Sequence, residues 1–164
     1  MIVTKTLMRM VEFFGADVRR INHALKVHSF ARLIANQENI TGTELNIIEL
    51  SAILHDIGIP AAVQKYQSSA GKYQEIEGPP IAREMLMHLG ASPETIYRIC
   101  YLIGNHHSYT KIDGIDFQIL VEADFLVNIF EDKMNAATVS VIRQKYFKTR
   151  TGVRLLEQIY MPEK

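Results

Sequence analysis

Histidines and carboxylates occur at three places in the chain where their chemistry suits a divalent cation. The adjacent pair His55 and Asp56 ends an apolar run, Asp124 lies inside another apolar run, and His23 lies on the apolar face of a third. Imidazole nitrogens and carboxylate oxygens are good ligands for borderline or hard divalent cations, and neither needs a thiolate partner. These residue types indicate a candidate metal site assembled from distant segments.

The pair His55 and Asp56 lies two residues before Gly58, a residue type that commonly ends helices. Adjacent positions of an intact helix point about 100° apart. The two side chains can therefore converge on one ion only at a frayed helix end. The alternative is a solvated Asp56 beside a hydrogen-bonded core histidine.

Asp124 and Asn128 share the apolar side of the expected helix 117–132, whereas Gln118 and Glu122 share another edge, which we expect to face solvent. A lone buried carboxylate is costly unless it is paired, protonated or bound to a cation. Asp124 therefore requires either a salt bridge to an arginine or a metal ion.

His23 shares a helix face with Val27 and other apolar residues, so we expect it to point inward. His28 lies about 140° round the same helix and is interpreted as a structural or surface residue. Arg19, one turn before His23, can meet a phosphate or a ligating carboxylate. The alternative for Arg19 is a solvated charge at the start of the helix.

Taken in order, these residues resemble the HD superfamily of metal-dependent phosphohydrolases. The resemblance runs from about Arg19 to Phe130, and its segments are His23 with Val27 and Ala31, Leu54-His55-Asp56-Ile57-Gly58, and Glu122-Ala123-Asp124. It implies a helical bundle around one divalent metal ion, which is Mn, Fe, Ni, Co, Zn or Mg. The ligands that it implies are His23, His55, Asp56 and Asp124. Asp56 is also the candidate catalytic residue, as a general base, although the sequence does not separate it from Asp124 in that role.

Accessory roles fall on four further candidates. The pair His106 and His107 is similar to paired histidines that serve some family members as extra ligands or phosphate contacts. A phosphoryl transition state needs positive charge around its oxygens, which Arg19, Lys72 or these histidines can supply. The alternative for Lys72 is an ordinary loop lysine, and for the histidines a solvated loop pair.

Three departures from the family pattern narrow the expectation. Gln74 stands where members with several metals often have a histidine, which favours one tightly held ion. Ile59 and Pro60 replace the basic residue that often follows the HDIG signature, and the Gly-Tyr-Pro element of the cyclic-dinucleotide-cleaving branch is missing. That branch is therefore disfavoured.

The sequence thus predicts a hydrolase that cleaves a small phosphorylated molecule, either a nucleotide or another phosphate ester, with metal-activated water. The alternative is a non-catalytic HD domain that binds a metal or a nucleotide as a sensor or interaction module.

Helical apolar spacing runs through almost the whole chain, which predicts an all-α, single-domain bundle over 1–164. We expect a metal-site core at about 19–130 and a C-terminal helical extension at 131–164. The expected helices are 3–14, 17–38, 41–56, 80–89, 92–104 and 117–132, with one or two more in 136–160. Asp17 and Ser92 suit N-caps, and Thr41 with Glu44 suits a capping box. Segments 60–80, apart from a short helical stretch near 61–66, and 105–116 are expected to be loops.

Composition limits the function classes. The 164 residues are 48% hydrophobic and 22% charged, with zero formal net charge, which argues against a protein that coats nucleic acid or an anionic membrane. One cysteine and a charge-interrupted N-terminal segment favour a cytoplasmic protein without a signal peptide. A homodimer is left open.

The C-terminal extension is rich in basic residues, with no acidic residue between Asp132 and Glu157. A solvated helix face is the usual meaning of such a run, and attraction of an anionic substrate or partner is the alternative. Its basic residues are Lys133, Arg143, Lys145, Lys148, Arg150 and Arg154.

Overall fold

The computed structural model describes residues 1–161, and this part of the chain is all-α, with no β-strand, as the sequence predicts. Residues 162–164 of the expected C-terminal extension lie outside the described part. The helices are α1 (Ile2–Phe14), α2 (Val18–Gln37), α3 (Gly42–Leu54), α4 (Ile59–Tyr66), α5 (Gly71–His88), α6 (Pro93–Ile103), a 3-10 turn η1 (Tyr109–Lys111), α7 (Ile115–Glu131), α8 (Ala136–Tyr146) and α9 (Arg150–Tyr160).

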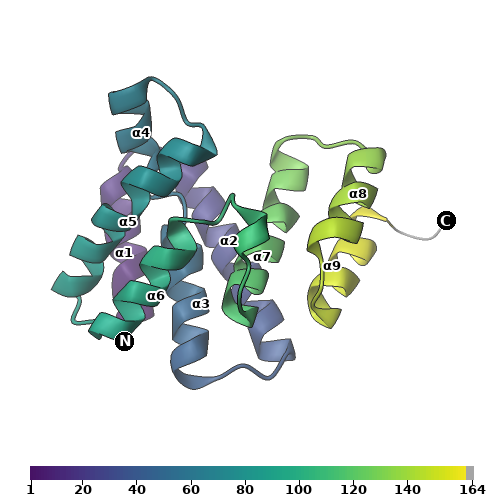
Figure 1. The fold of residues 1–164 in the computed structure, drawn as a ribbon, viewed down its shortest axis with the longest axis horizontal. Coiled ribbons are helices and arrows are strands. Elements are labelled where there is room, and N and C mark those ends of the chain that lie inside the picture. The colour runs from purple at the N-terminus through teal and green to yellow at the C-terminus, as the bar shows by residue number, and fades with distance from the viewer. Residues whose placement is uncertain (162–164) are drawn as a thin grey trace.

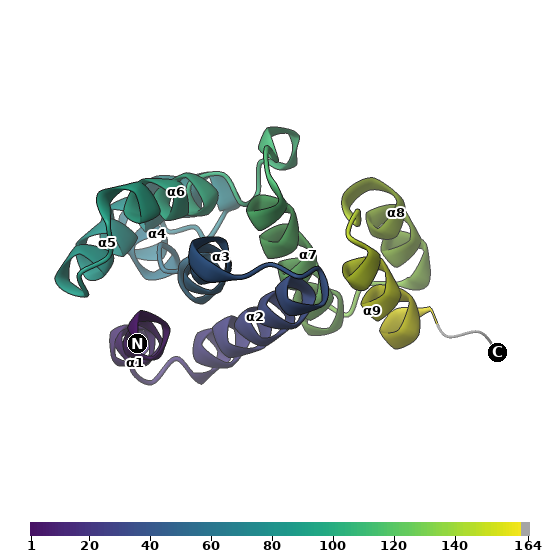
Figure 2. The ribbon, with the colours of Figure 1, turned by 90° about the horizontal axis from the view of Figure 1, so that it is seen from below.

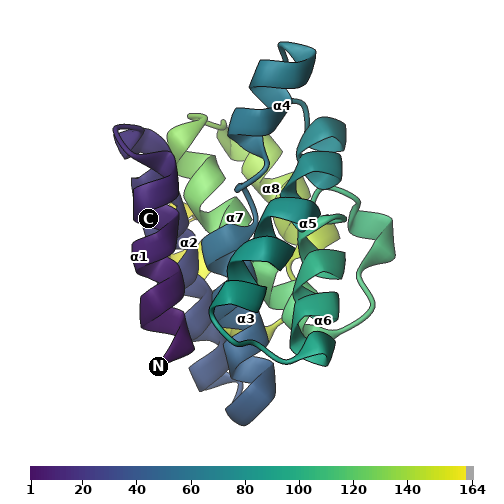
Figure 3. The same ribbon diagram turned by 90° about the vertical axis from the view of Figure 1, so that its left-hand side faces the viewer.

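Helix α3 is the central element. It packs against α2 and α7 on one side and against α1 and α6 on the other (Figures 1 and 2). Helices α1, α5 and α6 cover one flank of the molecule (Figure 3), while α8 and α9 pack against α7 at the opposite end. The carboxyl end of α3 therefore emerges in the interior of the bundle.

Every residue of α3 from Ile48 to Leu54 is buried. Ile48 and Ala52 belong to an apolar cluster shared with α2 and α7, whereas Ile53 and Leu54 belong to a second cluster shared with α1, α5 and α6. A helix that is apolar on all sides is stable only when it is buried on all sides. His55 directly follows this helix and is consequently placed between the two clusters.

The apolar stretch Gly42–Tyr66 meets the length and hydropathy of a membrane span, with a mean hydropathy of 1.3. In the folded chain, however, 67% of its most apolar window is buried inside the molecule. That burial is typical of the core helix of a globular protein, which meets the same length and hydropathy thresholds.

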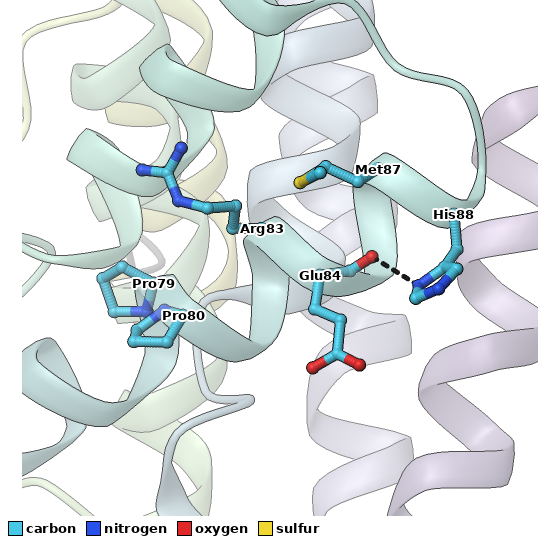
Figure 4. Close-up of a pocket in the computed structure, with 6 residues that line it drawn as sticks. All are labelled: Pro79, Pro80, Arg83, Glu84, Met87 and His88. Carbon is cyan, nitrogen blue, oxygen red and sulfur yellow. Dashed lines mark hydrogen bonds between the residues drawn. The ribbon is translucent and has the colours of Figure 1, made fainter.

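The expectation of a mostly irregular segment from 60 to 80 is wrong. Helix α5 begins at Gly71 and continues through Pro79 and Pro80. Gly78 precedes the first proline and has no Cβ to clash with the ring of Pro79. The buried stripe that holds α5 in place is Gln74, Gly78, Ala82 and Leu86. On the outer face, the two prolines and Met87 line a surface cavity of about 500 Å³ (Figure 4).

The helix caps agree with the sequence in two cases of three. The side chains of Asp17 and Ser92 accept hydrogen bonds from the backbone amides of Arg20 and Thr95, as predicted. The capping box at Thr41 is wrong, because its side chain makes no capping hydrogen bond. The next residue, Gly42, has φ of 66° and turns the backbone away from the geometry that a capping box needs.

Glu122 does not face solvent, which corrects a third expectation. Its side chain is fully buried and accepts hydrogen bonds from the backbone amides of Lys148 (2.6 Å) and Thr149 (2.8 Å) and from the Gln118 amide (2.7 Å). Because α8 and α9 pack across this edge of α7, the carboxylate satisfies the backbone of their connection. Glu122 therefore anchors the C-terminal helices to the bundle.

Candidate metal centre

Four side chains named from the sequence converge at one point inside the bundle. The Nε2 atoms of His23 and His55 are 3.1 Å apart. Asp124 Oδ1 lies 3.2 Å and 3.5 Å from these two nitrogens, and Asp56 Oδ2 lies 3.5 Å from each. The two imidazoles thus face each other, and one carboxylate oxygen of Asp56 and one of Asp124 lie close to both rings.

Three packed elements carry these groups to one place. His23 lies in α2, His55 and Asp56 lie in the turn that follows α3, and Asp124 lies in α7. Helices α2, α3 and α7 all pack against one another, so their inward faces share a centre (Figure 2). The turn after α3 also lets the adjacent His55 and Asp56 point the same way, as the helix-end interpretation requires.

The histidines near this centre are held with Nε2 inward. The Nδ1 atom of His55 bonds the Ala52 carbonyl at 2.9 Å, and that of His106 bonds the Ile103 carbonyl at 2.7 Å. Because carbonyls only accept, each Nδ1 carries a proton and donates, so Nε2 is the nitrogen that faces the centre and can bind a metal when it carries no proton. The Nδ1 of His23 instead donates to a carboxylate oxygen of Glu131 at 3.0 Å.

The donor set fits a divalent cation. Ligand atoms held about 2.1 Å from one ion stand roughly 3.0 Å apart in octahedral and 3.4 Å apart in tetrahedral geometry. The five distances at this centre span 3.1–3.5 Å, and two carboxylates balance the charge of one divalent ion. Second-sphere hydrogen bonds to each imidazole Nδ1 are also typical of metal-binding histidines.

A second group of donors adjoins the first through Asp56. One ligand atom from each of Asp56, His106 and His107 lies within 4.8 Å of the others. The Nε2 of His106 is buried without a hydrogen-bond partner in the described chain and lies 3.6 Å from Asp56 Oδ1. The Nε2 of His107 donates a 3.2 Å hydrogen bond to the amide oxygen of Gln74, so these two side chains are already paired with each other.

Electrostatic coupling within the cluster is strong. Burial alone lowers the pKa of His55, but Asp56 and Asp124 outweigh it and raise the pKa of His55 to about 9. Burial opposes ionisation of Asp56, yet the charge of His55 and the nearby His106 imidazole lower the pKa of Asp56 to about 2. Burial, followed by electrostatic interaction with His106, lowers the pKa of His107 to about 4. The carboxylates are therefore ionised at neutral pH and attract positive charge.

Of the accessory candidates Arg19 and Lys72, only Arg19 lies beside the converging side chains. Arg19 lines a cavity of about 310 Å³ together with His23 and Asp56, and the neighbouring Arg20 lines the same cavity. Lys72 is exposed in the first turn of α5, with its ammonium 4.7 Å from the centre of the Tyr73 ring, and it does not line that cavity.

The structural role expected for His28 is in keeping with its contacts, because it is buried and its Nε2 bonds Glu49 at 3.0 Å. This pair joins α2 to α3, away from the four converging side chains.

Two polar residues of the site were missed by the sequence reasoning. Asn128 donates to Asp124 Oδ1 at 2.9 Å, and Glu131 accepts from His23. With Asp124, they occupy positions i, i+4 and i+7 of α7 and therefore lie on one helix face. That spacing is visible in the sequence and places both residues on the face of Asp124, although it does not show which groups they contact.

Close backbone packing holds the turn that carries His55 and Asp56. A Cβ atom added to Gly58 would lie 2.5 Å from the Gly78 nitrogen and 2.7 Å from the Gln74 carbonyl oxygen, both backbone atoms of α5. A Cβ on Gly71 would lie 2.7 Å from the His107 ring. Glycine at these positions lets α5 approach both parts of the site.

The comparisons with known proteins agree with this architecture. The family model for the HD domain matches residues 20–134. A crystal structure of a predicted HD superfamily hydrolase from an uncultured Thermotogales bacterium matches with a TM-score of 0.70 and 23% sequence identity, over 96% of this chain and 84% of that one. No curated protein matches the sequence. The helical bundle with His23, His55, Asp56 and Asp124 at its centre thus belongs to the HD domain family.

Proposed function

We propose that this protein is a metal-dependent phosphohydrolase that cleaves a small phosphorylated substrate, a nucleotide or another phosphate ester. One observation carries the proposal: ligand atoms of His23, His55 and Asp56 all lie within 4.8 Å of one another, and an Asp124 oxygen lies 3.2 Å and 3.5 Å from the two histidine nitrogens, beside a cavity that arginines line. A bound divalent cation supplies Lewis-acid chemistry, because it polarises a phosphoryl oxygen and lowers the pKa of nearby water.

Asp56 is the better candidate for the general base. Its Oδ2 faces the two histidine nitrogens, whereas its Oδ1 points toward His106 and lies outside that set. Asp124 Oδ1 is already engaged by His23 and by the Asn128 amide. Asp56 is ionised at neutral pH and can accept a proton from the attacking water.

Arg19 is positioned to bind the oxygens of the phosphoryl group that do not react. Arg20 is paired with Asp17, whereas Arg19 has no ion-pair partner among residues 1–161. A guanidinium at the mouth of the cavity can donate two hydrogen bonds to one phosphate. Its charge also compensates the negative charge of the transition state.

The donor set favours one tightly held ion. Gln74 offers an amide oxygen where a histidine would offer a nitrogen, and that oxygen is occupied by His107. An amide oxygen is a weak ligand for a transition metal. Metal analysis of the purified protein is therefore expected to give one ion for each chain.

The test combines metal content with turnover of an aryl phosphate and a panel of nucleotides. Asp56→Ala is expected to lose both the metal and hydrolysis, because it removes the carboxylate whose two oxygens contribute to the two donor groups. Asp132→Asn, a charge change at an exposed residue beyond the site, serves as the control and retains both. An Asp56→Ala variant with normal metal content and rate contradicts the proposal. A wild-type protein that binds metal but hydrolyses no phosphate ester supports the non-catalytic sensor or interaction module instead.

A further inference from the structure

A second cavity, of about 630 Å³, adjoins the candidate metal centre and shares no lining residue with the cavity of Arg19. His107 lines this cavity and also belongs to the donor group with Asp56. Its walls come from the turn after α6, the first turns of α7 and the end of α8. The cavity is therefore formed where the C-terminal helices meet the bundle.

Positive charge dominates its lining. Lys111, Lys145 and Lys148 are among the lining residues, and none of the residues that line it is acidic. The ammonium of Lys111 donates to the Asn105 side-chain oxygen, and that of Lys148 donates to the Gln144 carbonyl, so both acceptors are neutral. The Glu75 carboxylate accepts hydrogen bonds from the His107 amide and the Ser108 hydroxyl behind this wall, and the three lysines still outnumber it. A concave surface with several cations focuses a positive potential and attracts anions.

Helix α7 fixes the relation of the two cavities to the centre. Gln118 lines the lysine cavity, Asn128 lines the arginine cavity, and Asp124 lies between them on the helix. At a rise of about 1.5 Å and a turn of about 100° per residue, Gln118 lies on the order of 9 Å from Asp124 along the helix axis and about 120° round it. Tyr109 also lines the lysine cavity. Its burial, and next the negative charge of Asp124, raise the pKa of its hydroxyl to about 12.

We propose that the lysine cavity binds a second phosphate group of the substrate while the first phosphoryl group reacts at the metal centre. This inference rests on the proposed function and narrows its substrate class. The substrate is an extended molecule with two phosphate groups roughly 10 Å apart, rather than a compact monoester. Its remote phosphate supplies binding energy that lowers KM. The geometry of the reacting phosphoryl group is still set by the residues of the metal centre.

Bisphosphates of linear alkanediols test the spacing directly, because they carry no base or sugar. We expect hexanediol bisphosphate to show a KM about tenfold lower than hexyl phosphate, since a second phosphate gains charge-assisted contacts. Ethanediol bisphosphate, whose phosphates are too close together to span both sites, gains no such advantage over ethyl phosphate. Equal KM values for hexanediol bisphosphate and hexyl phosphate overturn the proposal.

Removal of the lysine charges is the second arm. In a Lys145→Met, Lys148→Met double variant, the advantage of hexanediol bisphosphate disappears, while kcat and KM for hexyl phosphate stay as in the wild type. A Lys5→Met, Lys65→Met variant removes the same charge from exposed positions outside the cavity and keeps the advantage. If KM rises by the same factor for both substrates in the Lys145→Met, Lys148→Met variant, a dedicated second site is contradicted.

Calorimetry on metal-stripped protein separates this inference from the proposed function. Hexanediol bisphosphate is expected to bind the wild type about tenfold more tightly than the Lys145 and Lys148 double variant, with no turnover required. If that difference is found but no ester is hydrolysed, the anion site stands and the hydrolase assignment fails. If esters are hydrolysed and binding does not depend on the lysines, the second site alone fails.

Discussion

The Nδ1–H of His23 donates a 3.0 Å hydrogen bond to Glu131 Oε2, which joins α2 to the last residue of α7. The other oxygen of Glu131 accepts from Lys26 at 2.5 Å, so the carboxylate is fixed from two sides. His55 and His106 use backbone carbonyls for the same purpose. A carboxylate partner fixes the tautomer of an imidazole and also raises its strength as a ligand.

Glu131→Gln is expected to weaken metal binding by about 10- to 100-fold, since it keeps an acceptor for His23 but removes the negative charge. Competition with a chelator measures the change in affinity. Glu157→Gln, at a half-exposed carboxylate paired with Arg143 beyond the site, is the control and leaves metal affinity unchanged. Equal affinity of the Glu131→Gln variant and the wild type contradicts a positioning role for this carboxylate.

Metal uptake by the protein is expected to release protons at neutral pH. In the metal-free fold the pKa of His55 is raised to about 9, above its ordinary value of 6.5, so the ring is protonated at pH 7. A metal ligand must be neutral, and uptake therefore releases about one proton from His55 at pH 7 and progressively less as the pH rises through 9. Calorimetric titrations in buffers of different ionisation enthalpy count these protons, and a heat of binding that is independent of the buffer at pH 7 refutes the prediction.

The same shift predicts how the metal-free protein responds to pH. A pKa raised in the folded state stabilises the fold fully below pH 6.5, and this contribution is lost as the pH rises through about 9. Urea unfolding of metal-free protein is thus expected to show a lower free energy of unfolding at pH 9 than at pH 6.5. Saturation with metal, which replaces the proton, is expected to reduce or reverse that trend. Equal free energies of unfolding of the metal-free protein at pH 6.5 and pH 9 would contradict the raised pKa of His55.

Gly58→Ala is expected to lower the free energy of unfolding by about 3 kcal/mol, because its methyl group would overlap backbone atoms of Gly78 and Gln74 that cannot move independently. Gly15→Ala is a matched comparison: nothing lies within 4 Å of its Cβ, and only the positive φ of 56° opposes the change. That strain costs about 1 kcal/mol. Denaturant titration measures both values, and a Gly58→Ala cost no larger than that of Gly15→Ala would show that α5 yields easily.

The helices and their inward faces could be predicted in large part from the sequence, because local periodicity specifies them. His23 was assigned to an inward face by its spacing from Val27, and His55 with Asp56 was assigned to a helix end by the glycine that follows. The structure brings both together with Asp124. The prediction of a loop over 60–80 was wrong because proline and glycine are local signals for the end of a helix. Helix α5 forms in spite of them, since its stripe from Gln74 to Leu86 is buried against the bundle.

What the sequence by itself determined is the identity of the chemical groups and the helices that carry them, since residue type and periodicity are local properties. The tertiary structure alone decided their partners. Glu122 is buried rather than solvated because α8 and α9 fold back across α7, and Glu131 reaches His23 because α7 crosses α2. Such contacts join residues separated by 26 to 108 positions, and they depend on how whole helices pack, which no local pattern encodes.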